Sequence, residues 1–179
     1  MFDRDQAQDA WERWGMNCGP AALAVAVGLT PDQVRPWLDG FDSKRYTNPR
    51  MMFQALGEAA KCGQIRSHQV HVMGLNARVQ DGWPKFGLAR IQWEGPWLKA
   101  GVPIAARYRQ THWVAAQILE HRDRADEVRI FDVNAIRETG GIVTLAQWSE
   151  QLVPWLTKNY VPRADGGWHI THAIEVERS

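Results

Sequence analysis

The sequence contains only two cysteines, Cys18 and Cys62, among 179 residues. Two cysteines do not make the disulfide framework that holds small secreted domains together. Counting alone leaves a Cys18–Cys62 bridge open, but we expect free thiols in a reducing cytoplasm. The N-terminus agrees with this expectation, because residues 1–6 are polar and acidic and lack the basic and apolar regions of a signal peptide.

Long apolar runs and clusters of one charge sign are also lacking. No stretch reaches the roughly 18 apolar residues that a membrane-spanning helix needs, so we expect no membrane partner. The 21 basic and 20 acidic residues leave a net charge of +1, and no run of lysine or arginine stands out. This balance argues against a protein that binds nucleic acid through phosphate contacts. The oligomeric state stays open at this point.

The residues that are present predict one globular domain over residues 1–179. Hydrophobic residues make up 45% of the chain and charged residues 23%, as in ordinary soluble proteins. A chain of this size buries about 70% of its unfolded surface, which is enough for a substantial core. Ten tryptophans are spread along the chain. We expect most of them in the core, and aromatic walls around a cleft.

Helical patterns dominate the first third of the chain, and strand patterns dominate the rest. Helices are predicted for residues 3–13, 18–27, 31–38 and 49–62, with a polar loop at 39–47. Strands are predicted for residues 69–73, 86–93, 102–107, 112–120, 127–133, 142–143 and 168–176. An amphipathic helix is predicted over 145–160, where Pro154 should kink or split it. Helices followed by an antiparallel sheet indicate an α+β domain.

The segment Asn17–Leu23 places a thiol where an apolar helix begins. Pro20 suits the first helical turn, because its missing N–H would have had no partner there. The first turn of a helix has unpaired N–H groups and the positive end of the dipole, and both favour thiolate over thiol. Cys18 is therefore the predicted nucleophile.

A cysteine nucleophile needs a base, and the base needs a partner that orients it. His112 begins one predicted strand, and Asp132 ends the next. Antiparallel neighbours joined by a short turn place the start of one strand beside the end of the other. We therefore expect His112 and Asp132 to lie close together, with the helix that begins at Cys18 packed on the sheet and its thiol aimed at His112.

Four short segments resemble the papain-like cysteine peptidase superfamily. They are most similar to the bacterial branch that contains the leader-processing, or double-glycine, peptidases of bacteriocin exporters. The segments are Asn17–Ala24, Gly101–Ile104, His112–Val114 and Phe131–Asp132. The resemblance implies a papain-like fold, a peptide or protein substrate, and no cofactor. It also implies the order of roles: Cys18 as nucleophile, His112 as general base and Asp132 as orienter, with Asn134 as the alternative orienter.

The sequence departs from the papain-like pattern at Glu12, where these peptidases usually carry a glutamine whose amide helps to hold the oxyanion. A carboxylate at that place would repel the developing negative charge. The candidate oxyanion donors are therefore the side chains of Gln8 and Asn17, the Trp14 indole, and the backbone N–H of Cys18.

The main hypothesis is a thiol hydrolase, a cysteine peptidase that cleaves an amide bond through a Cys18 acyl-enzyme. Transglutaminase-like enzymes and deamidases are the first alternative, because they use Cys, His and Asp in the same order and a similar His-Trp-Val strand start. A binding module built on a degraded peptidase is the second alternative, and Glu12 motivates it.

Two histidine pairs suggest a metal site at first sight, at residues 68 and 71 and at residues 169 and 172. Both pairs lie in segments predicted to be extended, where side chains three residues apart point to opposite faces. The sequence therefore predicts no metal site at either pair.

Overall fold

The structure is a computed structural model that describes residues 4–14, 18–44, 46–73, 78–107, 109–123 and 125–179. At its centre is an antiparallel sheet of six strands in the order β1-β6-β2-β3-β4-β5. The strands are β1 (Ile65–Val72), β2 (Phe86–Trp93), β3 (Thr111–Leu119), β4 (Glu127–Phe131), β5 (Ile142–Thr144) and β6 (Trp168–Arg178). Helix and antiparallel sheet together confirm the α+β class.

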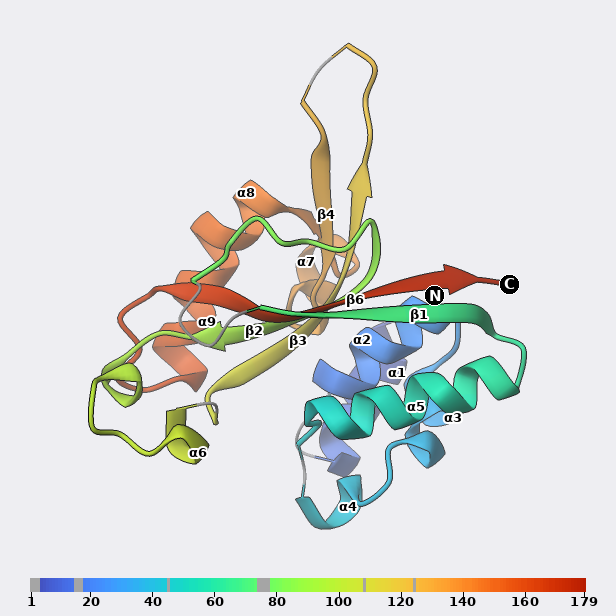
Figure 1. The fold of residues 1–179 in the computed structure, drawn as a ribbon, viewed down its shortest axis with the longest axis horizontal. Coiled ribbons are helices and arrows are strands. Elements are labelled where there is room, and N and C mark those ends of the chain that lie inside the picture. Colours follow the sequence, from blue (N-terminus) through green and yellow to red (C-terminus); the bar gives the residue numbers. More distant parts are fainter. Residues whose placement is uncertain (1–3, 15–17, 45, 74–77, 108, 124) are drawn as a thin grey trace.

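Helices lie against both faces of this sheet (Figure 1). The first group is α1 (Arg4–Trp14), α2 (Cys18–Val27), α3 (Pro31–Val34), η1 (Arg35–Trp37), α4 (Phe41–Lys44) and α5 (Pro49–Lys61). The later ones are η2 (Pro96–Leu98), α6 (Ile104–Arg107), η3 (Val133–Ala135), α7 (Ile136–Thr139), α8 (Leu145–Gln147), η4 (Trp148–Leu152) and α9 (Val153–Tyr160). Within the described ranges, none of these helices combines the length and the apolar character that crossing a membrane requires.

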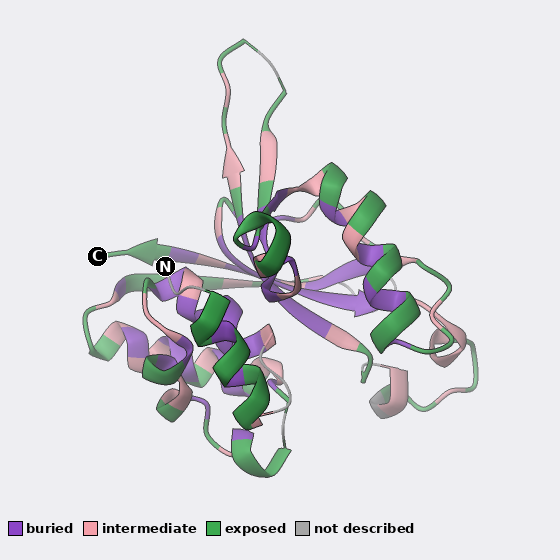
Figure 2. Cartoon of the chain, turned by 180° about the vertical axis from the view of Figure 1, so that it is seen from behind, coloured by how far each residue is buried: buried purple, intermediate pink, exposed green. Residues whose placement is uncertain are grey.

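Strand β2 is buried on both faces, because each face is covered by one of the two helix groups. Leu88 belongs to the core under α2 and α5, whereas Ala89 and Ile91 belong to the core under η4 and α9. A strand covered on both sides has an almost continuous apolar sequence rather than a strict alternation. Figure 2 shows the consequence: the central strands are buried, and the outward faces of the helices are exposed.

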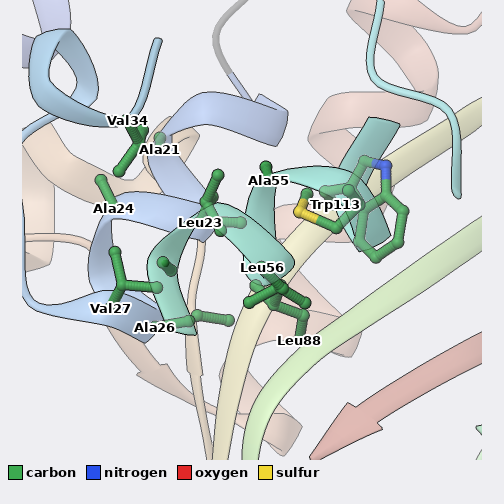
Figure 3. Close-up of a cluster of buried hydrophobic side chains, with 14 of the residues drawn as sticks. Ala21, Leu23, Ala24, Ala26, Val27, Val34, Ala55, Leu56, Leu88 and Trp113 are labelled. Atoms are coloured by element: carbon green, nitrogen blue, oxygen red, sulfur yellow. The ribbon is translucent and has the colours of Figure 1, made fainter. Parts of the chain in front are cut away.

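Helix α2 is the inner helix of the first core, and small side chains let it lie close to its neighbours. Ala21, Ala24 and Ala26 are each at most 1% exposed, and Figure 3 shows them with Leu56 of α5 and Leu88 of β2. At the start of the helix, a Cβ on Gly19 would lie 2.1 Å from the Thr47 hydroxyl oxygen, so only glycine fits this approach.

The helix boundaries predicted from capping residues are confirmed. The Thr30 side chain accepts a hydrogen bond from the backbone N–H of Gln33, and Asn48 does the same from Met51. Helix α2 occupies residues 18–27 as predicted and is followed by Gly28 at a φ of +76°. Residues 31–38 divide into α3 and the 3₁₀ turn η1, and the predicted loop at 39–47 contains the short helix α4.

The strand predicted for residues 102–107 is wrong, because residues 104–107 form helix α6. The N–H groups of Ala106 and Arg107 both donate to the carbonyl of Pro103, and the Arg107 side chain donates to the carbonyl of Val102. A proline before the apolar residues therefore started a helical turn here. Residues 145–160 are split near Pro154, as predicted, and the split takes the form of a π-helical turn at η4.

Candidate active site

His112 and Asp132 lie in contact, as the strand order predicted. His112 is the second residue of β3, and Asp132 directly follows β4, its antiparallel neighbour. His112 Nε2 lies 2.8 Å from Asp132 Oδ2. The imidazole is 7% exposed and the carboxylate is fully buried, so the contact is shielded from water.

Asp132 is held by three further donors. Its Oδ1 accepts hydrogen bonds from the backbone N–H of Asn134 at 3.0 Å and from Asn134 Nδ2 at 2.8 Å. Its Oδ2 also accepts from the Trp148 indole at 2.9 Å. Burial raises the pKa of Asp132, but the charge of His112 and these hydrogen bonds outweigh burial and hold it below its ordinary value. The orienting contact therefore comes from Asp132, and Asn134 supports the carboxylate rather than the imidazole.

His112 is held as an imidazolium. Burial lowers its pKa, but the buried carboxylate of Asp132 and the sulfur of Cys18 raise it to about 10. Trp93 stacks on the ring, with centroids 5.9 Å apart and an interplanar angle of 24°. Because Nε2 faces Asp132, the nitrogen left for Cys18 is Nδ1.

Cys18 is half-buried at the start of α2 and lines the same pocket as His112. Burial raises the pKa of the thiol, but the hydrogen bond and positive charge of His112 and the backbone N–H of Trp113 outweigh burial and lower it. Cys18 and Cys62 are both free thiols, and Cys62 is exposed. The thiolate is therefore favoured at Cys18 by its neighbours, and the disulfide left open by counting is absent.

Four tryptophans form a layer behind His112 and Asp132. Trp93 stacks on Trp148 with centroids 6.1 Å apart, and Trp168 and Trp83 meet Trp148 at its edges at 5.0 and 6.1 Å. Sequence analysis assigned none of these four tryptophans to the site, although Trp148 directly contacts the carboxylate. A signal was present, because a buried indole needs an acceptor, but no pattern in the sequence relates residue 148 to residue 132.

Two neighbouring cavities open at this site. The smaller, of about 160 Å³, is lined by Cys18 and His112 together with Trp93, Arg109 and Thr111. The larger, of about 570 Å³, lies between α1, α7 and α9. Trp11, Asn134 and Tyr160 line both cavities and form their common wall. The predicted aromatic walls of a cleft are thus found here.

The predicted oxyanion donors lie in different parts of the structure. Gln8 lines the larger cavity rather than the pocket of the thiol, and its Nε2 donates to Glu12 Oε1 at 2.8 Å, so this candidate is not at Cys18. Asn17 lies outside the described residues. Trp14 packs edge-on against Phe41 and belongs to the first core. Glu12 is exposed and does not line the pocket of the thiol, so its carboxylate does not face the reacting atoms.

The histidines of the second pair, at residues 169 and 172, have other partners. His169 Nδ1 lies 2.9 Å from Glu94 Oε1, and His172 Nδ1 lies 3.1 Å from the Thr171 hydroxyl. Burial, with the nearby charge of Arg90, lowers the pKa of His172 to about 4. Within the described part of the chain, no three His, Cys, Asp or Glu residues are grouped so as to hold a metal ion.

The site thus combines a favoured thiolate, an imidazolium and a buried carboxylate beside an open pocket. This set can attack a carbonyl carbon and can donate a proton to a leaving group. Comparison with known proteins adds no relative: the chain matches no protein-family model, no curated protein and no solved structure.

Proposed function

We propose that the protein is a thiol hydrolase, a cysteine peptidase of papain-like type that cleaves an amide bond through a Cys18 acyl-enzyme. The observation that carries the proposal is that Cys18 and His112 line one pocket while His112 Nε2 contacts Asp132. Sulfur, imidazole and carboxylate come from α2, β3 and the end of β4, so the fold itself assembles them. The Cys-His-Asp order and a nucleophile at a helix start support the papain-like assignment.

The reaction follows from the protonation states. The Cys18 thiolate attacks the amide carbonyl carbon, and the carbonyl oxygen takes the negative charge. The His112 imidazolium gives its proton to the leaving nitrogen as the C–N bond breaks, which leaves a thioester on Cys18. Neutral His112 then takes a proton from water, which attacks the thioester and releases the acid and the thiolate. Asp132 keeps the ring oriented and stabilises its charged form.

Selective alkylation tests the proposal. The protein is treated with iodoacetamide near pH 7, and the modified cysteine is identified by peptide mass mapping. Access alone favours Cys62, because Cys62 is exposed and Cys18 is half-buried. We expect Cys18 to react first, since the thiolate rather than the thiol is the nucleophile.

His112→Gln provides the matched control, because it removes the imidazolium and leaves both cysteines in place. Cys18 should then react more slowly than Cys62. If Cys62 reacts before Cys18 in the protein without substitutions, the result contradicts the proposal. Hydrolysis is tested separately with a mixture of tryptic peptides. New termini that are absent with Cys18→Ala support a peptidase, and incorporation of an added amine would instead indicate transfer.

A further inference from the structure

Three arginines line the two cavities without an ion-pair partner among the described residues: Arg4 and Arg137 in the larger cavity and Arg109 in the pocket of the thiol. All three are exposed. Some other exposed arginines are paired, such as Arg13 with Asp32. Glu138 is the one acidic side chain among the described residues that line either cavity. With a net charge of only +1 for the whole chain, the cavities are a local concentration of positive charge.

Exposed aromatic rings stand in the same place. Trp11 is 39% exposed, Trp155 45% and Tyr160 53%, and all three line the larger cavity. Tyr160 meets Trp155 at 5.3 Å and Trp11 at 6.5 Å between ring centroids, so the rings are neighbours. Large apolar groups that gather at a hollow on the surface are typical of a binding site rather than of ordinary exposure.

The two cavities are neighbours, which suits a chain-like ligand. Trp11, Asn134 and Tyr160 line both the pocket of the thiol and the larger cavity. The larger cavity, at about 570 Å³, is of the size that holds a ligand beyond one side chain. A substrate that presents an amide to Cys18 can therefore continue past the aromatic wall toward Arg4 and Arg137.

We propose that the larger cavity binds an acidic, extended polypeptide segment that flanks the bond presented to Cys18. This inference rests on the proposed function, because the thiol acts on an amide carbonyl, which a polypeptide supplies at every residue. Carboxylates of the segment pair with Arg4 and Arg137, and its apolar atoms pack on Trp11, Trp155 and Tyr160. We call this cavity, with its aromatic and arginine walls, the acidic-segment groove.

Binding, rather than turnover, tests the acidic-segment groove. The Cys18→Ala protein is titrated into a fluorescent peptide of about twelve residues, which spans roughly 40 Å when extended. Three peptides are compared, with glutamate, glutamine or lysine at every third position and the same leucine, serine and glycine residues elsewhere. We expect the glutamate peptide to bind about tenfold more tightly than the glutamine peptide at low salt. The preference should shrink as salt is added, because the charges are exposed.

The variant pair Arg4→Gln and Arg137→Gln should remove this preference, whereas the pair Arg50→Gln and Arg122→Gln should keep it. Arg50 and Arg122 are exposed and line neither cavity, so the control removes the same charge elsewhere. Equal binding of the glutamate and glutamine peptides would overturn the inference. So would a preference that survives in the groove variant, or tighter binding of a single-stranded DNA of similar length. No outcome depends on catalysis, so failure of the alkylation test and failure of this inference are distinguishable.

Discussion

The two faces of the sheet are packed in opposite ways. Around α2 the core is built mostly from alanines and aliphatic residues, and its buried aromatic residues are Phe41, Trp113 and Phe131. On the other face it contains the four tryptophans that stand behind His112 and Asp132. The first face carries the nucleophile, and the second carries the acid–base pair.

Each kind of packing suits the group that it holds. Small side chains bring the start of α2 close to β3, so the thiol can reach an imidazole on the strand. Large flat rings fill the space behind His112, and the indole N–H of Trp148 donates to Asp132. The first core thus sets the distance between the thiol and the imidazole. The second core excludes water from His112 and fixes the orientation of its ring. Variants in the two cores should therefore differ in what they change.

Asp132→Ala should have the largest effect. It leaves the buried Trp148 and Asn134 donors without their acceptor and removes the charge that keeps His112 protonated. We expect the free energy of unfolding to fall by about 3 kcal/mol and the alkylation rate of Cys18 near pH 7 to fall by at least ~10-fold. Urea unfolding and the mass-mapped alkylation measure the two. A variant that keeps its thiol reactivity would refute the orienting role.

Leu56→Ala should damage the first core and spare the chemistry. Leu56 is fully buried against α2. Its truncation should cost about 3 kcal/mol of unfolding free energy, while Cys18 in the folded protein keeps its alkylation rate, since no group near the sulfur changes. If the alkylation rate falls together with the unfolding free energy, the first core also controls thiol reactivity, which contradicts the difference between the two cores.

Trp148→Phe should sharpen the comparison within the second core. The variant keeps an aromatic ring and loses the indole N–H that binds Asp132. Trp83→Phe is the matched control, because the Trp83 indole N–H is buried with no hydrogen-bond partner in the described structure. We expect Trp148→Phe to lower the unfolding free energy by about 2 kcal/mol more than Trp83→Phe, and only Trp148→Phe to slow alkylation of Cys18. Equal losses in urea unfolding would assign Trp148 a packing role alone.

The smallest effect concerns pH. In Cys18→Ala, the charge and hydrogen bond of Asp132 still raise the pKa of His112. The folded protein therefore keeps a proton that the unfolded chain loses above pH 6.5, and stability should decline as the pH rises above that value. In the unaltered protein, Cys18 changes the stability with pH in the opposite direction. The folded thiol has already lost a proton that the unfolded thiol holds up to pH 9, so this contribution to stability increases with pH. Urea unfolding between pH 6.5 and 9 should therefore give a flatter profile for the unaltered protein. Parallel profiles would contradict a thiolate–imidazolium pair.

Sequence alone predicted the parts of the fold that depend on local chemistry. Helix α2, the caps at Thr30 and Asn48, and strand β2 were found because caps, prolines and apolar runs act over a few residues. The contact of His112 with Asp132 was also predictable, because a short turn between antiparallel strands fixes which ends meet.

Two kinds of feature were missed. Residues 102–107 have strand-like composition, but the N–H groups of Ala106 and Arg107 donate to the nearby carbonyl of Pro103 and form a helical turn instead. The others depend on contacts between residues that are remote in the sequence. Trp148 could not be assigned to Asp132, because the π-helical turn that carries its indole there arises where α8 joins α9. The acidic-segment groove was equally hidden, since α1, α7 and α9 are remote in the sequence and meet only in the folded chain.

The use of Nε2 for Asp132 has one more consequence. Nδ1 is bonded to the ring carbon that carries Cβ, so it lies nearer to the main chain than Nε2 does. The nucleophile must then come almost to the main chain of β3, where the Trp113 amide also reaches it. The small, buried alanines of α2 allow this close approach. A bulkier residue in place of one of them would push the helix away from the strand and part sulfur from nitrogen without altering either.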